Sequence, residues 1–248
     1  DGDTTVPLTA DNYTVTGIDG DVLVLNSATA GTFDNKNVGT GKVITIGGLS
    51  VASASNGGAA VFGYSSVVDQ GSGGLTGSIT PADLVVSTSP VSKVYDGTTS
   101  AAGVAVVRSG TLFTGDTLTG GSFAFLDKHA GTGKSVSVTG VSVDDGNGGA
   151  NYTLSFVNNT ASTITPASLT LGTNAVNRVY DGTTAAAGSV VVSGGSLFAG
   201  DTLSGGNFAF LDKHVGTGKT VAVSGVSVND GNGGGNYNGQ RGNNNGGG

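Results

Sequence analysis

The chain has 248 residues, 47 glycines, no cysteine and a formal net charge of −7, and charged residues make up only 11% of it. Glutamate is absent and the other strong helix formers are scarce, so the composition excludes a helical protein and predicts an all-β fold. The basic residues are scattered, which excludes nucleic-acid binding, and no apolar run approaches the roughly 18 residues of a membrane span. A surface solvated by Ser, Thr and Asn fits an extracellular protein without disulfides.

One sequence unit recurs along the chain. Val-Tyr-Asp-Gly-Thr-Thr at residues 94–99 returns at 179–184, and Phe-Ala-Phe-Leu-Asp-Lys-His at 123–129 returns unchanged at 208–214. A more divergent copy precedes these two, in which Gly-Thr-Gly-Lys at 39–42 matches residues 131–134. Self-similarity at a fixed period is typical of a repeat protein.

The repeats predict three domains. Residues 1–80 form a divergent first copy that lacks its first strand, and residues 81–165 form a complete second copy. Residues 166–248 form a third copy that lacks its last strand and ends in a Gly/Asn-rich tail. Proline at each joint, without a long linker, favours stiff end-to-end packing.

Alternating apolar residues and turn signals place about seven strands in the complete copy. In chain order they cover residues 84–88, 92–95, 104–108, 122–126, 135–143, 151–157 and 161–165. This density of short strands is typical of a β-sandwich. We therefore predict tandem small Ig-like β-sandwich repeats arranged end to end as a rod.

The longest predicted strand contains a change of phase. Val136 and Val138 alternate in one register, and Val141 and Val143 resume with the parity shifted by one around Gly140. The other two copies repeat the pattern around Gly48 and Gly225. Such a slip at a glycine predicts a β-bulge or a sharp bend.

The Tyr-Asp-Gly motif is interpreted as a corner of the fold. Gly97 can adopt a positive φ, Asp96 can accept a hydrogen bond from the backbone two residues on, and Tyr95 can bury its ring against the sheet.

No residue is assigned to catalysis. His129 and His214 are the only histidines, and Asn37 replaces them in the first copy. The histidine is absent from one copy, and no set of acidic residues converges on it in the other two. The sequence therefore shows no Ser-His-Asp triad and no metal site built on a histidine. We therefore expect no enzyme activity and no cofactor.

The Asp/Asn/Gly-rich turns are the best candidates for a metal site. Their oxygen ligands are Asp144, Asp145, Asn147, Asp230 and Asn232. Carboxylates on a Gly-rich turn suit Ca²⁺, but no Glu supplies a bidentate ligand, and Asn-Gly is itself a strong turn signal. We expect a structural turn, with calcium binding as the alternative.

The Val-Tyr-Asp-Gly-Thr-Thr, Gly-Asp-Thr-Leu and Gly-Thr-Gly-Lys motifs, with Asn-Tyr-Thr-Leu and Ile-Thr-Pro-Ala, resemble the YDG repeat, which is similar to MBG repeats. Both occur in large secreted bacterial adhesins of the filamentous-haemagglutinin type. The resemblance covers essentially the whole chain and is weaker in the first copy. It implies an extracellular or cell-surface segment exported by two-partner secretion, without catalytic residues.

The expected function is a non-enzymatic structural segment, the stalk or fibre body of a surface adhesin or extracellular filament. One alternative is a module that binds a host or cell-surface glycan or protein directly. Another is a filament subunit that assembles head to tail by strand complementation. The expected partners are neighbouring repeats or subunits of the same protein.

Overall fold

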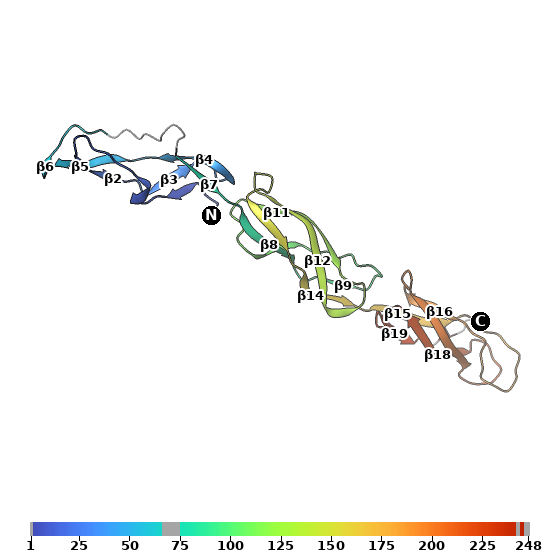
Figure 1. Ribbon diagram of the computed structural model, residues 1–248. Helices are drawn as coiled ribbons and strands as arrows, with labels where there is room; N and C mark the ends of the chain where they lie inside the picture. The colour runs from blue at the N-terminus through green and yellow to red at the C-terminus, as the bar shows by residue number, and fades with distance from the viewer. Residues whose placement is uncertain (1, 66–74, 242–243, 246–248) are drawn as a thin grey trace. The chain divides into compact units, whose positions relative to one another are not determined.

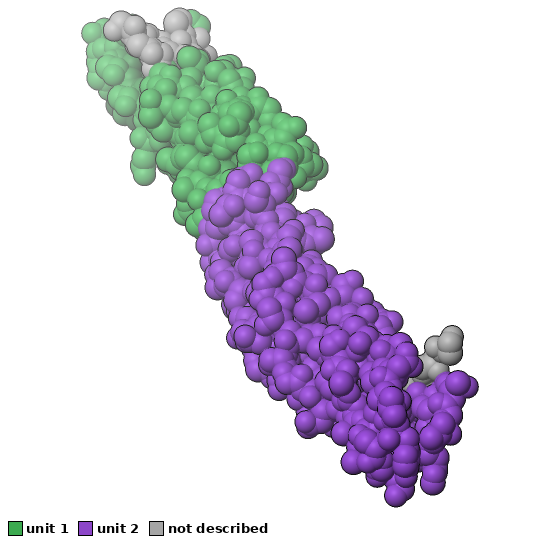
Figure 2. All heavy atoms as spheres, turned by 90° about the vertical axis from the view of Figure 1, so that its right-hand side faces the viewer, with its two compact units in different colours: residues 1–85, 109–119, 142–155 green, residues 86–108, 120–141, 156–248 purple. Residues whose placement is uncertain are grey.

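The computed structural model describes residues 2–65, 75–241 and 244–245, in which strands and one short 3-10 turn, η1 (Ala10–Asn12), are the regular elements (Figure 1). The prediction of an all-β fold is confirmed. Within these residues, no helix has the length and apolar character to cross a membrane. The chain forms two compact units, residues 1–85 with 109–119 and 142–155, and residues 86–108 with 120–141 and 156–248 (Figure 2). Each unit therefore contains one joint between copies.

The first copy forms two sheets, with strand orders β1-β3-β4-β7 and β2-β5-β6. The strands are β1 (Thr5–Pro7), β2 (Val22–Asn26), β3 (Ala30–Phe33), β4 (Gly39–Ile46), β5 (Ser50–Asn56), β6 (Ala59–Ala60) and β7 (Thr76–Ile79). The strands of each sheet pair antiparallel, and Phe33 of β3 lies opposite the buried Ile44 of β4.

The second copy also forms two sheets, with strand orders β10-β8-β13 and β11-β12-β14-β9. The strands are β8 (Ala82–Thr88), β9 (Ser92–Val94), β10 (Ala105–Ser109), β11 (Thr117–Phe125), β12 (Gly131–Asp144), β13 (Tyr152–Phe156) and β14 (Asn159–Thr165). Every predicted strand of this copy has a counterpart in the structure. The pairing of β14 with β9 is parallel, a detail that the sequence pattern does not contain.

The third copy repeats this plan, with strand orders β16-β15-β19 and β17-β18-β20. The strands are β15 (Ala167–Thr173), β16 (Val190–Gly195), β17 (Thr202–Phe210), β18 (Thr220–Asn229), β19 (Tyr237–Arg241) and β20 (Asn244–Asn245).

The third copy contains β19, the counterpart of β13, in a segment where the sequence predicted no strand. β19 pairs in parallel with β15, from Ala167 opposite Tyr237 to Leu171 opposite Arg241. Backbone hydrogen bonds do not require apolar side chains, so the edge of β15 accepts a segment whose Asn-Gly-Gln sequence gives no strand signal.

The core of the second unit is continuous across the joint between the second and third copies. From the second copy it contains Val91, Tyr95, Phe125, Val136 and Ile164, and from the third copy Ala167, Leu169, Leu171 and Tyr237. Because these buried side chains form one cluster, the two copies share part of their hydrophobic stabilisation.

The change of phase at Gly140 is a bend. Gly140 and Gly225 have φ values of 66° and 69°, and valines on both sides of Gly140 are buried. The β17–β18 register nevertheless continues without a slip from Thr202↔Asn229 to Phe210↔Val221. The neighbouring strand supplies Gly206, with a φ of 116°. The bend therefore rests on positive-φ glycines in two adjacent strands, with no residue bulged out in this pair.

We predict that Gly140→Ala destabilises the second copy by about 1–2 kcal/mol because an L-residue is strained at positive φ. Open space surrounds the added Cβ, so strain is the only cost. Gly140→Asn is expected to cost less, since Asn tolerates the left-handed region. Urea denaturation measures both variants, with the exposed Thr139→Ala as the control. Equal stability of Gly140→Ala and the control would contradict this account.

Candidate functional site

The Tyr-Asp-Gly loop is held by its own aspartate and by a cation. Asp96 Oδ1 accepts a hydrogen bond from the Thr98 N–H at 2.9 Å, and Lys93 Nζ donates to the same oxygen at 2.8 Å. Burial opposes ionisation of Asp96, but Lys93 and Thr98 outweigh it and lower the pKa of this carboxyl. Lys93 also lies 5.5 Å from the centre of the Phe125 ring. The loop is therefore held on the core below it, and Gly97 has the expected positive φ of 77°.

A second loop presents Lys128 and His129. Asp127 Oδ1 accepts a hydrogen bond from the His129 N–H at 2.9 Å and forms an ion pair with Lys134. Lys134 is also the main reason that the pKa of Asp127 is lowered. Tyr95, Lys128 and His129 lie at the same end of the second copy and together form what we call the Tyr–Lys face.

Each copy carries a complementary surface, which we call the Asp face. In the third copy the Phe198 N–H donates to Tyr237 Oη at 2.9 Å, and Tyr237 Oη donates to Asp201 Oδ2 at 2.6 Å. The same chain of two hydrogen bonds occurs in the other copies, with Phe113, Tyr152 and Asp116 and with Ile18, Tyr64 and Asp21.

At the second joint, the Tyr–Lys face of the second copy packs on the Asp face of the third. Tyr95 Oη donates to Asp201 Oδ2 at 2.9 Å, and Lys128 Nζ lies 3.5 Å from Asp201 Oδ1. The Tyr95 ring packs edge-on against Phe198 and Tyr237, with centroid distances of 5.5 and 5.4 Å. Asp201 thus receives two tyrosine hydroxyls and a lysine in a place where its side chain is 1% exposed.

An asparagine completes the second joint. Asn236 Oδ1 accepts from the Ala130 N–H at 2.8 Å, and Asn236 Nδ2 lies 3.3 Å from His129 Nδ1. The Asn236 N–H donates to Asp230 Oδ2 at 2.8 Å. The Asp230 turn therefore fixes the residue that contacts the preceding copy.

The first joint reproduces these contacts with different residues. Lys36 Nζ lies 3.3 Å from Asp116 Oδ1, and the Val38 N–H donates to Asn151 Oδ1 at 2.9 Å. Asn151 Nδ2 donates to Asn37 Oδ1 at 3.2 Å, so Asn37 takes the position of His129. The side chain at this position is therefore a polar contact between copies in both joints.

The joints also raise the pKa values of their tyrosines and of Lys128. Burial, together with the hydrogen bond to Asp201, raises the pKa of Tyr237 to about 12. Burial likewise raises the pKa of Tyr95 and Tyr152, while Tyr95 and Asp201 raise the pKa of Lys128. At neutral pH the tyrosines are hydrogen-bond donors and the lysine is a cation, as a carboxylate at the joint requires.

The calcium candidates occupy the two equivalent turns, and both buried carboxylates bind backbone there. Asp145 accepts N–H groups of Asn147, Gly149 and Asn151 at 2.7–2.9 Å. Asp230 accepts those of Asn232, Gly234 and Asn236, each at 2.8 Å. Asn147 and Asn232 each donate a side-chain bond to the joint asparagine, whereas Asp144 is exposed. Within the described residues no three His, Cys, Asp or Glu side chains cluster in a way that could hold a metal.

Sequence reasoning missed the joints. It did not assign Asp116, Asp201, Tyr237 or Asn236 a role, and it interpreted His129 without a partner. The available signals were the repeated Gly-Asp-Thr-Leu and Asn-Tyr motifs. They lie about 35 residues apart in one copy, and the groups that they contact lie in the preceding copy, so spacing alone could not connect them.

Two sheets in each copy and an Asp–Tyr–Lys joint between copies define an all-β repeat protein. The chain belongs to the YDG domain family, whose model matches residues 1–62, 80–163 and 165–243. No curated protein and no solved structure matches the chain.

We predict that the free energy of unfolding decreases as the pH is lowered, because Asp145 and Asp230 become protonated. Burial raises their pKa values, but three backbone N–H donors outweigh it, so both pKa values are lowered on folding. A lowered folded-state pKa contributes stability above the unfolded-state value of roughly 4, and this contribution is lost as the pH falls further. Urea midpoints between pH 6 and pH 2 measure the effect. An Asp145→Asn/Asp230→Asn double variant should show a shallower slope, and an unchanged slope would contradict the assignment.

We predict that Tyr95→Phe destabilises the second unit by about 1 kcal/mol, and that Asp201→Ala does so by about 3 kcal/mol because it also leaves buried hydroxyls and a lysine unpaired. Thermal denaturation measures both changes. The matched control is Tyr180→Phe, the same position in the third copy, where the side chain is exposed and no loss is expected. Equal effects of the two Tyr→Phe changes would show that the joint is not stabilising.

Proposed function

We propose that this chain is a non-enzymatic structural segment, the stalk or fibre body of a secreted bacterial surface adhesin or extracellular filament. The proposal includes export by two-partner secretion, in a protein of the filamentous-haemagglutinin type. It rests on membership of the YDG domain family, on the cysteine-free and weakly charged composition, and above all on the recurrence of one joint.

The recurring joint is the observation that carries the proposal. A Lys–Asp ion pair and an Asn side chain that accepts a backbone N–H occur at both joints, at Lys36–Asp116 and at Lys128–Asp201. Because the same contact recurs between successive copies, we expect each copy to have the same orientation relative to the next. This constancy is useful in a spacer and has no evident use in an enzyme.

In this proposal each copy is a small β-sandwich made from its two sheets, and the copies follow one another as a rod. With domains of about 40 Å, three copies would extend over roughly 100–150 Å. The groups that could carry chemistry have structural contacts instead: Asp127 binds Lys134 and a backbone N–H, and His129 lies against Asn236.

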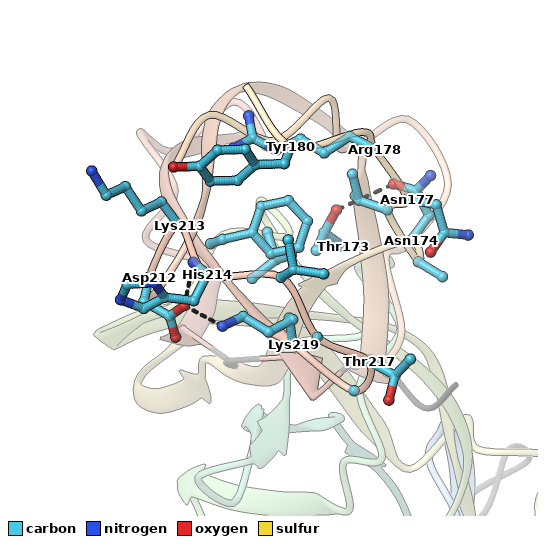
Figure 3. A pocket seen from close by; sticks show the side chains of 17 residues that line it. Thr173, Asn174, Asn177, Arg178, Tyr180, Asp212, Lys213, His214, Thr217 and Lys219 are labelled. Atoms are coloured by element: carbon cyan, nitrogen blue, oxygen red, sulfur yellow. Dashed lines mark hydrogen bonds and ion pairs between the residues drawn. The ribbon is translucent and has the colours of Figure 1, made fainter. Parts of the chain in front are cut away.

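Strand complementation is a second candidate, and a hollow in the third copy favours it. The hollow has a volume of about 360 Å³ and is lined by residues that include Asn177, Arg178, Tyr180, Lys219 and Val221 (Figure 3). In the second copy, the equivalent position between β12 and β9 is occupied by β14. In the third copy, the described part of this edge of β18 pairs with the two residues of β20, and the counterpart of β9 is not a strand, so a strand from another molecule could add there.

Direct binding of a host or cell-surface glycan or protein is the remaining candidate. The same hollow combines an arginine, a tyrosine and amide side chains, which are groups that bind polar ligands. Arg178, however, already donates to Asp181, Thr183 and Ala185 and so is engaged in holding its own loop. This favours the structural function over ligand binding.

Small-angle X-ray scattering of the full chain tests the structural proposal. We expect a maximum dimension of roughly 100–150 Å that does not change with salt, because the joints are partly buried. A variant with Lys128→Glu and Tyr95→Ala should show a flexible joint, while Lys213→Glu with Tyr180→Ala, the same change in the third copy, should not. A compact or equally flexible wild-type particle would contradict a stiff spacer.

A further inference from the structure

The third copy exposes a second Tyr–Lys face, formed by Tyr180, Lys213 and His214. Tyr95 in the second copy is 1% exposed, whereas Tyr180 is 57% exposed, and Val215, which replaces Ala130, is 87% exposed. Figure 3 shows the Tyr180 hydroxyl and the Lys213 ammonium pointing to the same side of the hollow. The groups that bind an Asp face at the second joint are thus present in the third copy and accessible.

This exposed face has the same internal supports as its buried counterpart. The Thr183 N–H donates to Asp181 Oδ1 at 2.9 Å, as in the Asp96 loop, and Arg178 replaces Lys93 over an aromatic ring. Asp212 accepts the His214 N–H at 2.8 Å and pairs with Lys219. Because these contacts lie within the third copy, the face is formed before any partner binds.

The first copy exposes the complementary surface. Its Asp face contains the same two hydrogen bonds, from the Ile18 N–H to Tyr64 Oη at 2.9 Å and from Tyr64 Oη to Asp21 Oδ2 at 2.6 Å. Ile18, which takes the place of Phe198, is 68% exposed. Asp21 Oδ1 accepts from Asn56 Nδ2 at 2.8 Å, and within the described residues no lysine or arginine forms an ion pair with Asp21.

We propose that the Tyr–Lys face of the third copy binds the Asp face of a further copy of this repeat, which in a solution of this chain is the first copy of a second molecule. Lys213 and Tyr180 would contact Asp21 as Lys128 and Tyr95 contact Asp201 inside the chain. The inference rests on the proposed structural function and adds the partner of the exposed faces. Head-to-tail contact of this kind is heterologous, so it continues in one direction from copy to copy.

One difference sets the strength of this contact. Gly63 stands before Tyr64, where Asn151 and Asn236 stand in the other copies, so the amide that accepts a backbone N–H is missing. Linked modules meet at effective concentrations in the millimolar range. A contact that forms within a chain therefore needs only weak affinity. For the same contact between separate molecules we expect a dissociation constant on the order of 0.1–1 mM.

A charge exchange tests the contact by sedimentation velocity of the full chain at up to about 1 mM. Wild type should associate with increasing concentration. Asp21→Lys alone and Lys213→Asp alone should each weaken association about tenfold or more, since each places like charges opposite one another. An equimolar mixture of the two variants should associate again, because every contact in it can be of opposite charge. Asp83→Lys and Arg108→Glu, at exposed positions outside both faces, are the matched controls.

A disulfide provides a second measurement that leaves Asp21 intact. At the internal joints a Cβ on Gly97 would lie 3.0 Å from Phe198 Cβ, and one on Gly2 would lie 2.9 Å from Phe113 Cβ. The equivalent pair between molecules is Gly182 and Ile18, within reach of a disulfide after a small shift. The chain has no cysteine. Mixed Gly182→Cys and Ile18→Cys chains should therefore form a cross-linked heterodimer, whereas Gly182→Cys with Arg108→Cys should not.

The outcomes separate this inference from the proposed function. Restored association of the charge-exchanged mixture and the specific cross-link support it. Absence of both, in chains whose circular dichroism is that of wild type, overturns it, while a stiff particle by scattering would leave the proposed function standing. If association is unchanged by the charge exchange but is blocked by a peptide of residues 159–165, the inference is overturned in favour of strand complementation.

Discussion

The carboxyl group of Asp201 has almost no access to water, so the surrounding residues must supply the hydrogen bonds that water would otherwise provide. Its own copy provides one tyrosine hydroxyl, and the preceding copy provides a second hydroxyl and a lysine. A buried charge that loses a partner is strongly destabilising. The hydrogen bonds and the ion pair of this one side chain therefore require two successive copies to remain in contact, and the aromatic rings around it add buried apolar area at the same joint.

Aspartate has a second use in the turns of this chain, in which every acid is Asp. Asp96, Asp127, Asp145 and their counterparts each accept the N–H of the residue two positions on. The short side chain makes this contact in a turn. The loops of both faces are consequently shaped from within a copy, and only the groups at their tips remain to meet the next one.

The sequence predicted the strands of the complete copy well, because alternating apolar residues and glycine-rich turns are local signals. It failed for β19, where the edge of β15 orders a polar segment, and no local signal connected the slip at Gly140 with the positive-φ glycines of the neighbouring strand. The joint between copies could not be predicted from the sequence for another reason. Asp201, Tyr95 and Lys128 are brought together by tertiary contact, and each of them reads as an ordinary surface or turn residue when taken alone.

The parallel pairing of β15 with β19, and of β9 with β14, has a mechanical consequence. When the chain is pulled from its two ends, neighbouring parallel strands from the beginning and the end of a copy are drawn in opposite directions. Their hydrogen bonds are then loaded in shear and must break together, whereas an antiparallel hairpin pulled open at its ends loses them one at a time. We therefore expect a copy built in this way to resist tension better than a copy of the same size whose terminal strands are paired as an antiparallel hairpin.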